Sequence, residues 1–134
     1  MKKRSKQNPS FLNYKLRPVF RDRRGDIFDF VEGEVGHVGM VTFKKGVTRG
    51  NHYHKRSTQF SYVLDGRIRL VVSDFSKRKR REFVLSPGTF TRIPPRTIHT
   101  YTALTPARMI DITTLKRGKR GYEDDTYRLL KNFK

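Results

Sequence analysis

The sequence predicts an all-β protein, and two kinds of observation carry that prediction. From residue 26 onward, short segments rich in β-branched and aromatic residues alternate with turn residues, and no stretch before residue 122 has a helical period. Asp65-Gly66 is a two-residue hairpin signal, and Pro87-Gly88 and Pro94-Pro95 mark chain reversals that cannot lie in a central strand. Seven or eight strands at this spacing indicate a sandwich or a barrel.

The expected strands are the β-branched and aromatic segments between these turns. In chain order they are residues 27–31, 37–43, 58–64, 67–73, 81–85, 89–93, 98–103 and 107–114. The last dozen residues predict a short C-terminal helix, because acidic Asp124 and Asp125 would favour its start. The apolar residues that follow them are Tyr127, Leu129, Leu130 and Phe133.

The composition predicts a single folded domain. Of the 134 residues, 34% are hydrophobic, including 10 Phe and 6 Tyr, so one core can be filled. We expect residues 21–134 to form this domain and residues 1–20 to form a basic N-terminal arm. The lack of cysteine excludes disulfides and thiolate metal sites, and no apolar run approaches the roughly 20 residues of a membrane-spanning helix. A soluble, cytoplasmic protein is expected.

The net charge of +19 first suggests a nucleic-acid partner, because Lys and Arg displace counterions from phosphates. Thirteen of the 31 basic residues, however, fall in three short runs, within residues 2–6, 77–81 and 116–120. The other 18 basic residues exceed the 12 acidic ones by six. None of the runs resembles a recognition helix or an RNA-binding strand motif. A polyanion-binding barrel is therefore kept as the least favoured hypothesis.

Three of the four histidines form one predicted cluster with Gln59. Residues two apart in a strand point to the same face with Cβ atoms about 6–7 Å apart, so His52 and His54 can converge on one small object. His99 and Gln59 can join them only if the strands close around a shared cavity. Three nitrogens and one oxygen suit Zn, Fe, Mn or Ni. The simpler interpretation is a group of polar residues near the mouth of a barrel.

The spacing of these residues resembles the cupin superfamily. The first cupin motif is matched by Gly46, His52, His54 and Gly66, with Gln59 where an acid is usual. The second motif is matched by Gly88, Pro94 and His99, with Arg96 where a second glycine is usual. The resemblance spans residues 26–114. It implies a jelly-roll β-barrel of six to eight strands and, as is common in the superfamily, a homodimer; it implies no one reaction.

A narrower set of residues resembles the dTDP-sugar epimerase-like cupins, and in particular the 3,4-ketoisomerases that act on dTDP-4-keto-6-deoxyglucose. The similar segments are Arg49 to Lys55 with Gln59, Ile93 to Pro95 with His99, Asp22 to Gly25, and Tyr122 to Arg128. Gln at position 59 is usual in that family. The resemblance implies an isomerase that requires no cofactor, binds a nucleoside-diphosphate sugar and moves protons with the histidines of the H-x-H motif.

Moving a keto group from C4 to C3 needs a base that titrates near neutrality, as histidine does. We expect His52 and His54 to carry the protons and His99 to orient the sugar. The candidates for the diphosphate, whose oxygens guanidinium groups bind in pairs, are Arg49, Arg69, Arg92 and Arg96, and Lys55 is a further expected substrate-binding residue. Tyr101 shares the face of His99 and could contact the base or the sugar. Tyr53 should point away from the histidines, and His37, which has no motif partner, should be structural.

Two departures leave a second enzyme class open. The ketoisomerases usually have a tyrosine about eleven residues before the first motif histidine, where this chain has Val41. The segment Arg49 to His54 also resembles the zinc-binding cupin domain of capsular-polysaccharide enzymes, which have Glu at the position of Gln59. The alternative is therefore a metal-binding cupin, catalytic or not, whose ligands would be His52, His54, Gln59 and His99. An amide oxygen is a weaker ligand for a divalent cation than a carboxylate.

Overall fold

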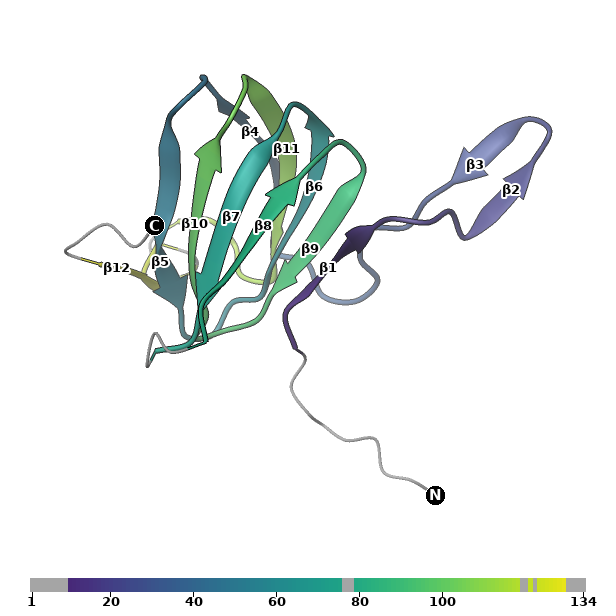
Figure 1. The fold of residues 1–134 in the computed structure, drawn as a ribbon. Helices are drawn as coiled ribbons and strands as arrows, with labels where there is room; N and C mark the ends of the chain where they lie inside the picture. The colour runs from purple at the N-terminus through teal and green to yellow at the C-terminus, as the bar shows by residue number, and fades with distance from the viewer. Residues whose placement is uncertain (1–9, 76–78, 119–120, 122, 130–134) are drawn as a thin grey trace.

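The protein folds into two facing five-stranded sheets and a separate two-stranded hairpin (Figure 1). The computed structural model describes residues 10–75, 79–118, 121 and 123–129. The strands in this part of the chain are β1 (Leu12–Lys15), β2 (Phe20–Asp22), β3 (Gly25–Ile27), β4 (His37–Phe43), β5 (Thr48–His54), β6 (Gln59–Asp65), β7 (Ile68–Ser73), β8 (Arg81–Leu85), β9 (Thr89–Ile93), β10 (Ile98–Ala103), β11 (Ala107–Thr113) and β12 (Thr126–Arg128).

The sheets have the crossed strand order of a jelly roll. The first sheet has the order β1-β9-β6-β11-β4, and the second has the order β12-β5-β10-β7-β8. Every pair is antiparallel, and most neighbours in a sheet are distant in sequence. The all-β jelly roll expected from the sequence is confirmed. None of the described residues belongs to a helix long and apolar enough to cross a membrane.

Most of the expected strands form where the turn signals place them. Residues 37–43, 81–85, 89–93 and 98–103 match β4, β8, β9 and β10 residue for residue. The segment 27–31 does not form a strand as expected, because only Ile27 is paired and Phe30 packs on rings of the first sheet. There the Phe30 ring packs 4.7 Å from the ring of Tyr62.

Apolar side chains from both sheets fill one end of the barrel. Val63, Ile68, Leu70 and Leu85 are completely buried there and pack against residues such as Met109. Burial of apolar surface stabilises a fold by about 25 cal/mol for each Å² removed from water, so these buried side chains contribute to its stability. Their position leaves the other end of the same strands free to carry polar groups.

The N-terminal part of the chain extends beyond the barrel. β1 lies within the expected basic arm and pairs with β9, so at least this piece of residues 1–20 adds to the first sheet. The β2–β3 hairpin that follows projects away from both sheets (Figure 1). Residues 2–6 of the first basic run lie outside the described residues, and the division at residue 20 stays a prediction.

The expected C-terminal helix is wrong for residues 126–128. These residues form β12, which pairs with β5 at the edge of the second sheet. The Tyr127 ring stacks on the Tyr53 ring at 5.3 Å, and the buried carboxylate of Asp125 accepts backbone N–H groups of residues 55–57. Contacts with a distant strand therefore outweigh the local helix signal. Leu130 and Phe133 lie outside the described residues.

Candidate functional site

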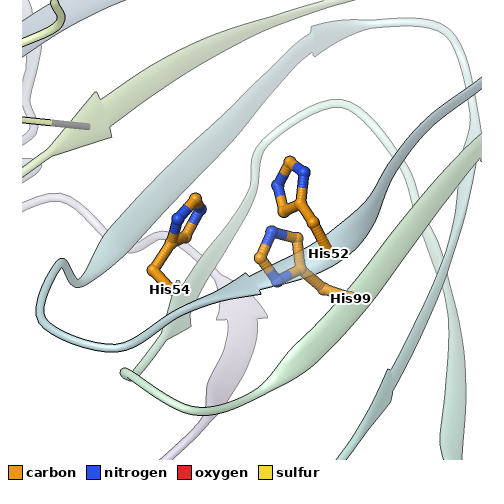
Figure 2. Close-up of side chains that lie close together, drawn as sticks. All are labelled: His52, His54 and His99. Carbon is orange, nitrogen blue, oxygen red and sulfur yellow. The ribbon is translucent and has the colours of Figure 1, made fainter. Parts of the chain in front are cut away.

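His52, His54 and His99 meet inside the barrel (Figure 2). The first two lie on β5 and the third lies directly opposite His52 on β10. Their ring centroids are 4.7–5.4 Å apart, and one nitrogen from each ring lies within 4.8 Å of the others. The convergence predicted from the sequence is thus present in the fold.

A local irregularity in the sheet brings the two strands this close. The register between β10 and β5 shifts between His99 and Thr100, next to Gly50. Gly50 has a φ of +94°, and a Cβ atom on it would lie 2.9 Å from the carbonyl oxygen of His99. A side chain at this position would be both strained and crowded, so the close approach requires glycine.

Burial keeps the three imidazoles neutral. Burial, followed by the positive charge that His99, His54 and Arg128 would present, lowers the pKa of His52 to about 2. Burial and then the His54 charge lower the pKa of His99 to about 3. Burial also lowers the pKa of His54, although the Asp125 carbonyl and Gln59 oppose that shift. Neutral rings at neutral pH have a lone pair available to accept a proton or bind a cation.

Hydrogen bonds distinguish the three rings. His99 Nδ1 donates to the carbonyl of Thr97 at 3.0 Å, which leaves its Nε2 as an acceptor. His54 Nδ1 lies 3.2 Å from the carbonyl oxygen of Asp125, and its Nε2 lies 3.3 Å from Gln59 Oε1. Among the described residues, His52 Nδ1 and His99 Nε2 have no hydrogen-bond partner. These two buried nitrogens are the open positions of the cluster.

Gln59 links the cluster to a carboxyl group that the sequence analysis missed. Gln59 Nε2 donates a hydrogen bond of 2.8 Å to Oδ1 of Asp111, on β11. Burial raises the pKa of the Asp111 carboxyl above its usual value. Asp111 interrupts the inner face of β11 between Met109 and Thr113. A charged residue at an inward position of an apolar strand was the signal that could have revealed it.

A cavity of about 310 Å³ opens beside His52. Four of the expected site residues line it, namely Arg49, His52, Gln59 and Tyr101. The other lining residues are Val41, Phe43, Thr48, Gly50, Met109, Asp111, Arg117, Glu123 and Arg128. His54 and His99 do not line the cavity and pack against the His52 ring. His52 is therefore the histidine that a bound molecule would meet first.

Guanidinium groups at the cavity give it a basic lining. Arg49 donates to the carbonyl of Thr42 at 3.1 Å, and its guanidinium lies 5.5 Å from the centroid of the Phe43 ring. Arg128 pairs with His52 in the register between β12 and β5. Arg117 forms an ion pair of 3.5 Å with Glu123. The sequence indicated Arg117 only as part of a basic run and gave it no role in the site. Arg128 lies on a strand that the sequence did not predict.

Four of the expected binding residues lie elsewhere. Arg69 alternates with the buried Ile68 and Leu70, points outward and pairs with Glu82 at 2.7 Å. Arg92 lies over the Phe60 ring, at 5.9 Å from its centroid. Lys55 Nζ lies 4.6 Å from the centroid of the Tyr127 ring, and Arg96 lines a separate hollow beside Phe11 and Thr97. None of these four lines the cavity beside His52.

Tyr53 and His37, which were not expected to act in the site, do not line the cavity. Tyr53 points away from the histidines, as expected, and its ring contacts those of Phe75 and Tyr127. His37 lies at the start of β4 and does not line the cavity. Its ring covers Gly39, where an added Cβ atom would lie 2.8 Å from His37 Cε1, which agrees with a packing role.

The donor set fits a metal ion in part. Three imidazole nitrogens within 4.8 Å suit Zn, Fe or Ni, and two of the rings have an open buried nitrogen. The hydrogen bond between His54 and Gln59, however, occupies the other two expected ligands, and Gln59 is also held by Asp111. A cation would have to replace the bond between His54 and Gln59 in order to use all four.

The solved structures similar to this chain include enzymes that act on sugar nucleotides. A sugar 3,4-ketoisomerase from Thermoanaerobacterium thermosaccharolyticum in complex with TDP is 19% identical, with a TM-score of 0.71 over 90% of this chain and 88% of that one. The TDP-quinovose 3,4-ketoisomerase of Campylobacter jejuni is 16% identical, with a TM-score of 0.73 over 89% and 92% of the chains. The dTDP-4-dehydrorhamnose 3,5-epimerase of Sulfolobus tokodaii is 24% identical, with a TM-score of 0.66 over 85% and 76%.

At these identities the structural likeness establishes the fold and leaves the reaction open. No curated protein sequence matches the chain. The family model of the cupin domain matches residues 39–113, from β4 to the end of β11. This range holds all three histidines, Gln59 and Asp111, and it covers more than half of the sequence. The jelly roll, the two histidine motifs and this match agree, and the chain belongs to the cupin family.

Proposed function

We propose that the protein is a sugar-nucleotide isomerase that moves a keto group between neighbouring carbons of a deoxy sugar. The observation that carries the proposal is the contact between a buried, neutral histidine cluster and a cavity lined by guanidinium groups. Similar folds belong to 3,4-ketoisomerases and an epimerase of dTDP-linked sugars, which supports this substrate class.

The reaction requires proton transfers and no net redox change. A base removes the proton from C3, and the C4 carbonyl oxygen gains a proton, which gives an enediol. Loss of the O3 proton and delivery of a proton to C4 then produce the 3-keto sugar. His52 suits the first step, because its neutral ring lines the cavity. His54 and His99 pack against that ring and can exchange or stabilise the proton.

The basic lining suits a diphosphate. Guanidinium groups bind phosphate oxygens in pairs and carry charge at any working pH, so Arg49 and Arg128 are the residues we assign to this role. The negative charge of a bound diphosphate would favour the protonated form of His52 and so raise its pKa from the low value in the free protein. Substrate binding would then strengthen the base that the reaction needs.

Solvent-exchange NMR tests the proposal. The protein is incubated with dTDP-4-keto-6-deoxyglucose in D2O, and the C3 and C4 protons of the sugar are followed. We expect exchange and formation of a 3-keto product with the wild-type protein, and loss of both with His52→Ala. Ser61→Ala is the matched control, because Ser61 is buried in the barrel, forms a hydrogen bond with Thr91 and does not line the cavity. No exchange with the folded wild-type protein would refute the proposed reaction.

A metal-dependent cupin is the second candidate, and the convergence of the three imidazole nitrogens favours it. In that case His52, His54 and His99 would hold the ion, and Gln59 would supply a weak fourth ligand. A bound cation would act as a Lewis acid that polarises a substrate carbonyl. Elemental analysis and calorimetric titration with Zn²⁺, Fe²⁺, Mn²⁺ and Ni²⁺ separate the two candidates. Near-stoichiometric binding that is lost in His99→Ala would favour the metal-dependent class.

We also propose that the protein pairs with a second copy of itself through the outer face of the first sheet. Outward residues of an antiparallel sheet that faces water are normally polar, but here directly opposed apolar residues cover four neighbouring strands. Val38 and Met40 on β4 are 61% and 55% exposed. Phe60, Tyr62 and Ile110 on this face are partly exposed, whereas Phe90 and Ile112 on the same face are buried within the chain.

The projecting hairpin supplies the complementary surface. Phe20 and Ile27 are a cross-strand pair of the β2–β3 hairpin, and both are about half exposed. A two-fold pair in which each hairpin lies on the sheet of the other copy would cover both apolar surfaces at once. Light scattering should give the mass of two chains, and Met40→Lys should give one. Val84→Lys, on the outer face of the second sheet, is the control; a monomeric wild-type protein would refute the pairing.

A further inference from the structure

Asp111 is a buried carboxyl group whose hydrogen-bond partner is an amide. The residue is 4% exposed, and its Oδ1 accepts the hydrogen of Gln59 Nε2 at 2.8 Å. No ion pair between described residues includes Asp111. The positive charges that His37 and Arg117 would present offset only part of the cost of burying this carboxyl group, and an apolar residue would pack here at lower cost. The position therefore suggests a role beyond packing.

The other end of the same amide faces His54. Gln59 Oε1 lies 3.3 Å from His54 Nε2. An amide has one donor end and one acceptor end, whereas an ionised carboxylate only accepts. Asp111 therefore fixes the Gln59 nitrogen toward itself and leaves the oxygen for His54. In this arrangement, the hydrogen bond requires a hydrogen on Nε2 of His54.

The second nitrogen of His54, Nδ1, faces another acceptor, the carbonyl oxygen of Asp125 at 3.2 Å, and it also lies 3.5 Å from the Thr126 hydroxyl, which can donate to it. A neutral imidazole has a single ring hydrogen and can satisfy only one of these two acceptors. If the Gln59 amide turned around, its nitrogen would donate to Nε2, and the ring hydrogen would move to Nδ1 and the Asp125 carbonyl. The direction of the amide thus decides which His54 nitrogen bears the hydrogen.

We propose that Asp111 is a positioning residue that holds the Gln59 amide in one direction and thereby keeps the ring hydrogen of His54 on Nε2. The path runs from β11 through β6 to β5, and it uses side chains that are all buried. The hydrogen-bond path does not depend on the substrate. Its contribution to turnover rests on the proposed isomerase function, because only there does His54 exchange protons with His52.

Ring 15N chemical shifts of His54, measured at one neutral pH, test the path directly, because protonated and unprotonated ring nitrogens have well-separated shifts. Asp111→Asn places both a donor and an acceptor beside Gln59, which allows the amide to turn. We expect Nε2 to shift toward the unprotonated range and Nδ1 toward the protonated range. The control is Ser61→Ala, two residues from Gln59 on the same inner face, and it should leave both shifts unchanged. Unchanged His54 shifts in folded Asp111→Asn would overturn the proposal.

Gln59→Leu removes the amide that links Asp111 to His54, and it provides a second test of the same path if Asp111→Asn does not fold. Without the amide, His54 Nε2 has lost its acceptor, and we expect the same movement of the hydrogen to Nδ1. In the Gln59→Leu background, Asp111→Asn should then have no further effect on His54, since the connection is gone. An unchanged His54 in Gln59→Leu, or an equal additional shift in the double variant, would contradict the path.

Kinetics measure what the path contributes to turnover. Asp111→Asn should lower kcat about tenfold to a hundredfold while KM stays within about twofold, because Asp111 acts on a proton-transfer group rather than on the diphosphate. A rise in KM with unchanged kcat would instead assign Asp111 to substrate binding and overturn its positioning role. If the wild-type protein shows no turnover, the isomerase proposal fails, and the 15N shifts still decide the hydrogen-bond path.

Discussion

The two ends of the barrel interior are built from the same strands and differ in what they contribute. β6 carries Val63 in the apolar end and Gln59 in the polar end, and β10 carries Ala103 and His99 in the same way. The apolar end holds completely buried side chains such as Val63, whereas the polar end has buried nitrogens without hydrogen-bond partners among the described residues, and the cavity lies between the two. Position along a strand, rather than the strand itself, therefore separates stability from chemistry in this fold.

Leu70→Ala should give the largest effect, and it should act on stability alone. Leu70 is completely buried in the apolar end, and its truncation removes contacts and leaves a cavity. We expect the free energy of unfolding to fall by about 2–5 kcal/mol, measured by chemical denaturation, while TDP affinity stays unchanged. Val84→Ala, at an exposed position, should have little effect. A loss of TDP binding in folded Leu70→Ala would show that the two ends are not separate.

His52→Leu should show the opposite behaviour. The substitution removes a buried nitrogen that lacks a partner, so the free energy of unfolding should stay the same or rise. Turnover of the keto sugar should fall by about a hundredfold or more, because the cavity loses its base. Denaturation curves and progress curves from one preparation measure both effects. A marked loss of stability would mean that the polar end also holds the fold together.

Lower pH should weaken the polar end. The pKa values of the three histidines are lowered on folding, so the unfolded chain binds more protons below its own histidine pKa of about 6.5. Stability is then fully present above that pH and falls as the pH drops toward the folded values. The expected slope is about 1.4 kcal/mol per pH unit for each histidine. The raised pKa of Asp111 opposes this trend.

Denaturation at pH 7.5, 6.5 and 5.5 measures the effect. Replacing His99 with Leu should reduce the slope between the two lower pH values. A stability that rises as the pH falls over this range would contradict the burial of neutral rings.

Arg49→Ala should have the smallest of these effects. Arg49 lines the cavity and is expected to contact the diphosphate, so TDP should bind severalfold to about tenfold more weakly, as measured by calorimetry. Arg69→Ala is the matched control, because this guanidinium lies on the outer face and pairs with Glu82. Equal losses in both variants would indicate a general effect of charge rather than a defined contact.

The sequence predicts the barrel well where local signals suffice. β8, β9 and β10 are bounded by prolines, glycines or a charged loop, so each strand can be recognised from its own apolar residues and the turns beside it. β1 and β12 were missed because each is short and is stabilised by a partner far along the chain, β9 and β5 respectively. No local pattern encodes such pairing, and the acidic start of the last segment favoured a helix instead.

The candidate site divides in the same way. The convergence of His52, His54 and His99 could be predicted, because motif spacing on strands fixes which face each residue takes. Arg69 and Arg92 were assigned to the ligand from their chemistry, although each alternates with inward residues and therefore points outward. Arg128 was noted only as the end of the segment Tyr122 to Arg128, and its place at the cavity could not be predicted because it depends on the pairing of β12 with β5.

The buried carboxylate of Asp125 anchors the last described strand to the candidate site. It collects the N–H groups of residues 55–57, while the same segment presents its carbonyl to His54 and carries Arg128 to the cavity. A barrel made without residues 123–129 would therefore keep its apolar end and lose one wall of the cavity. A synthetic peptide of that segment, added back, could then act as a switch for ligand binding, which offers a route to a split sensor built on this fold.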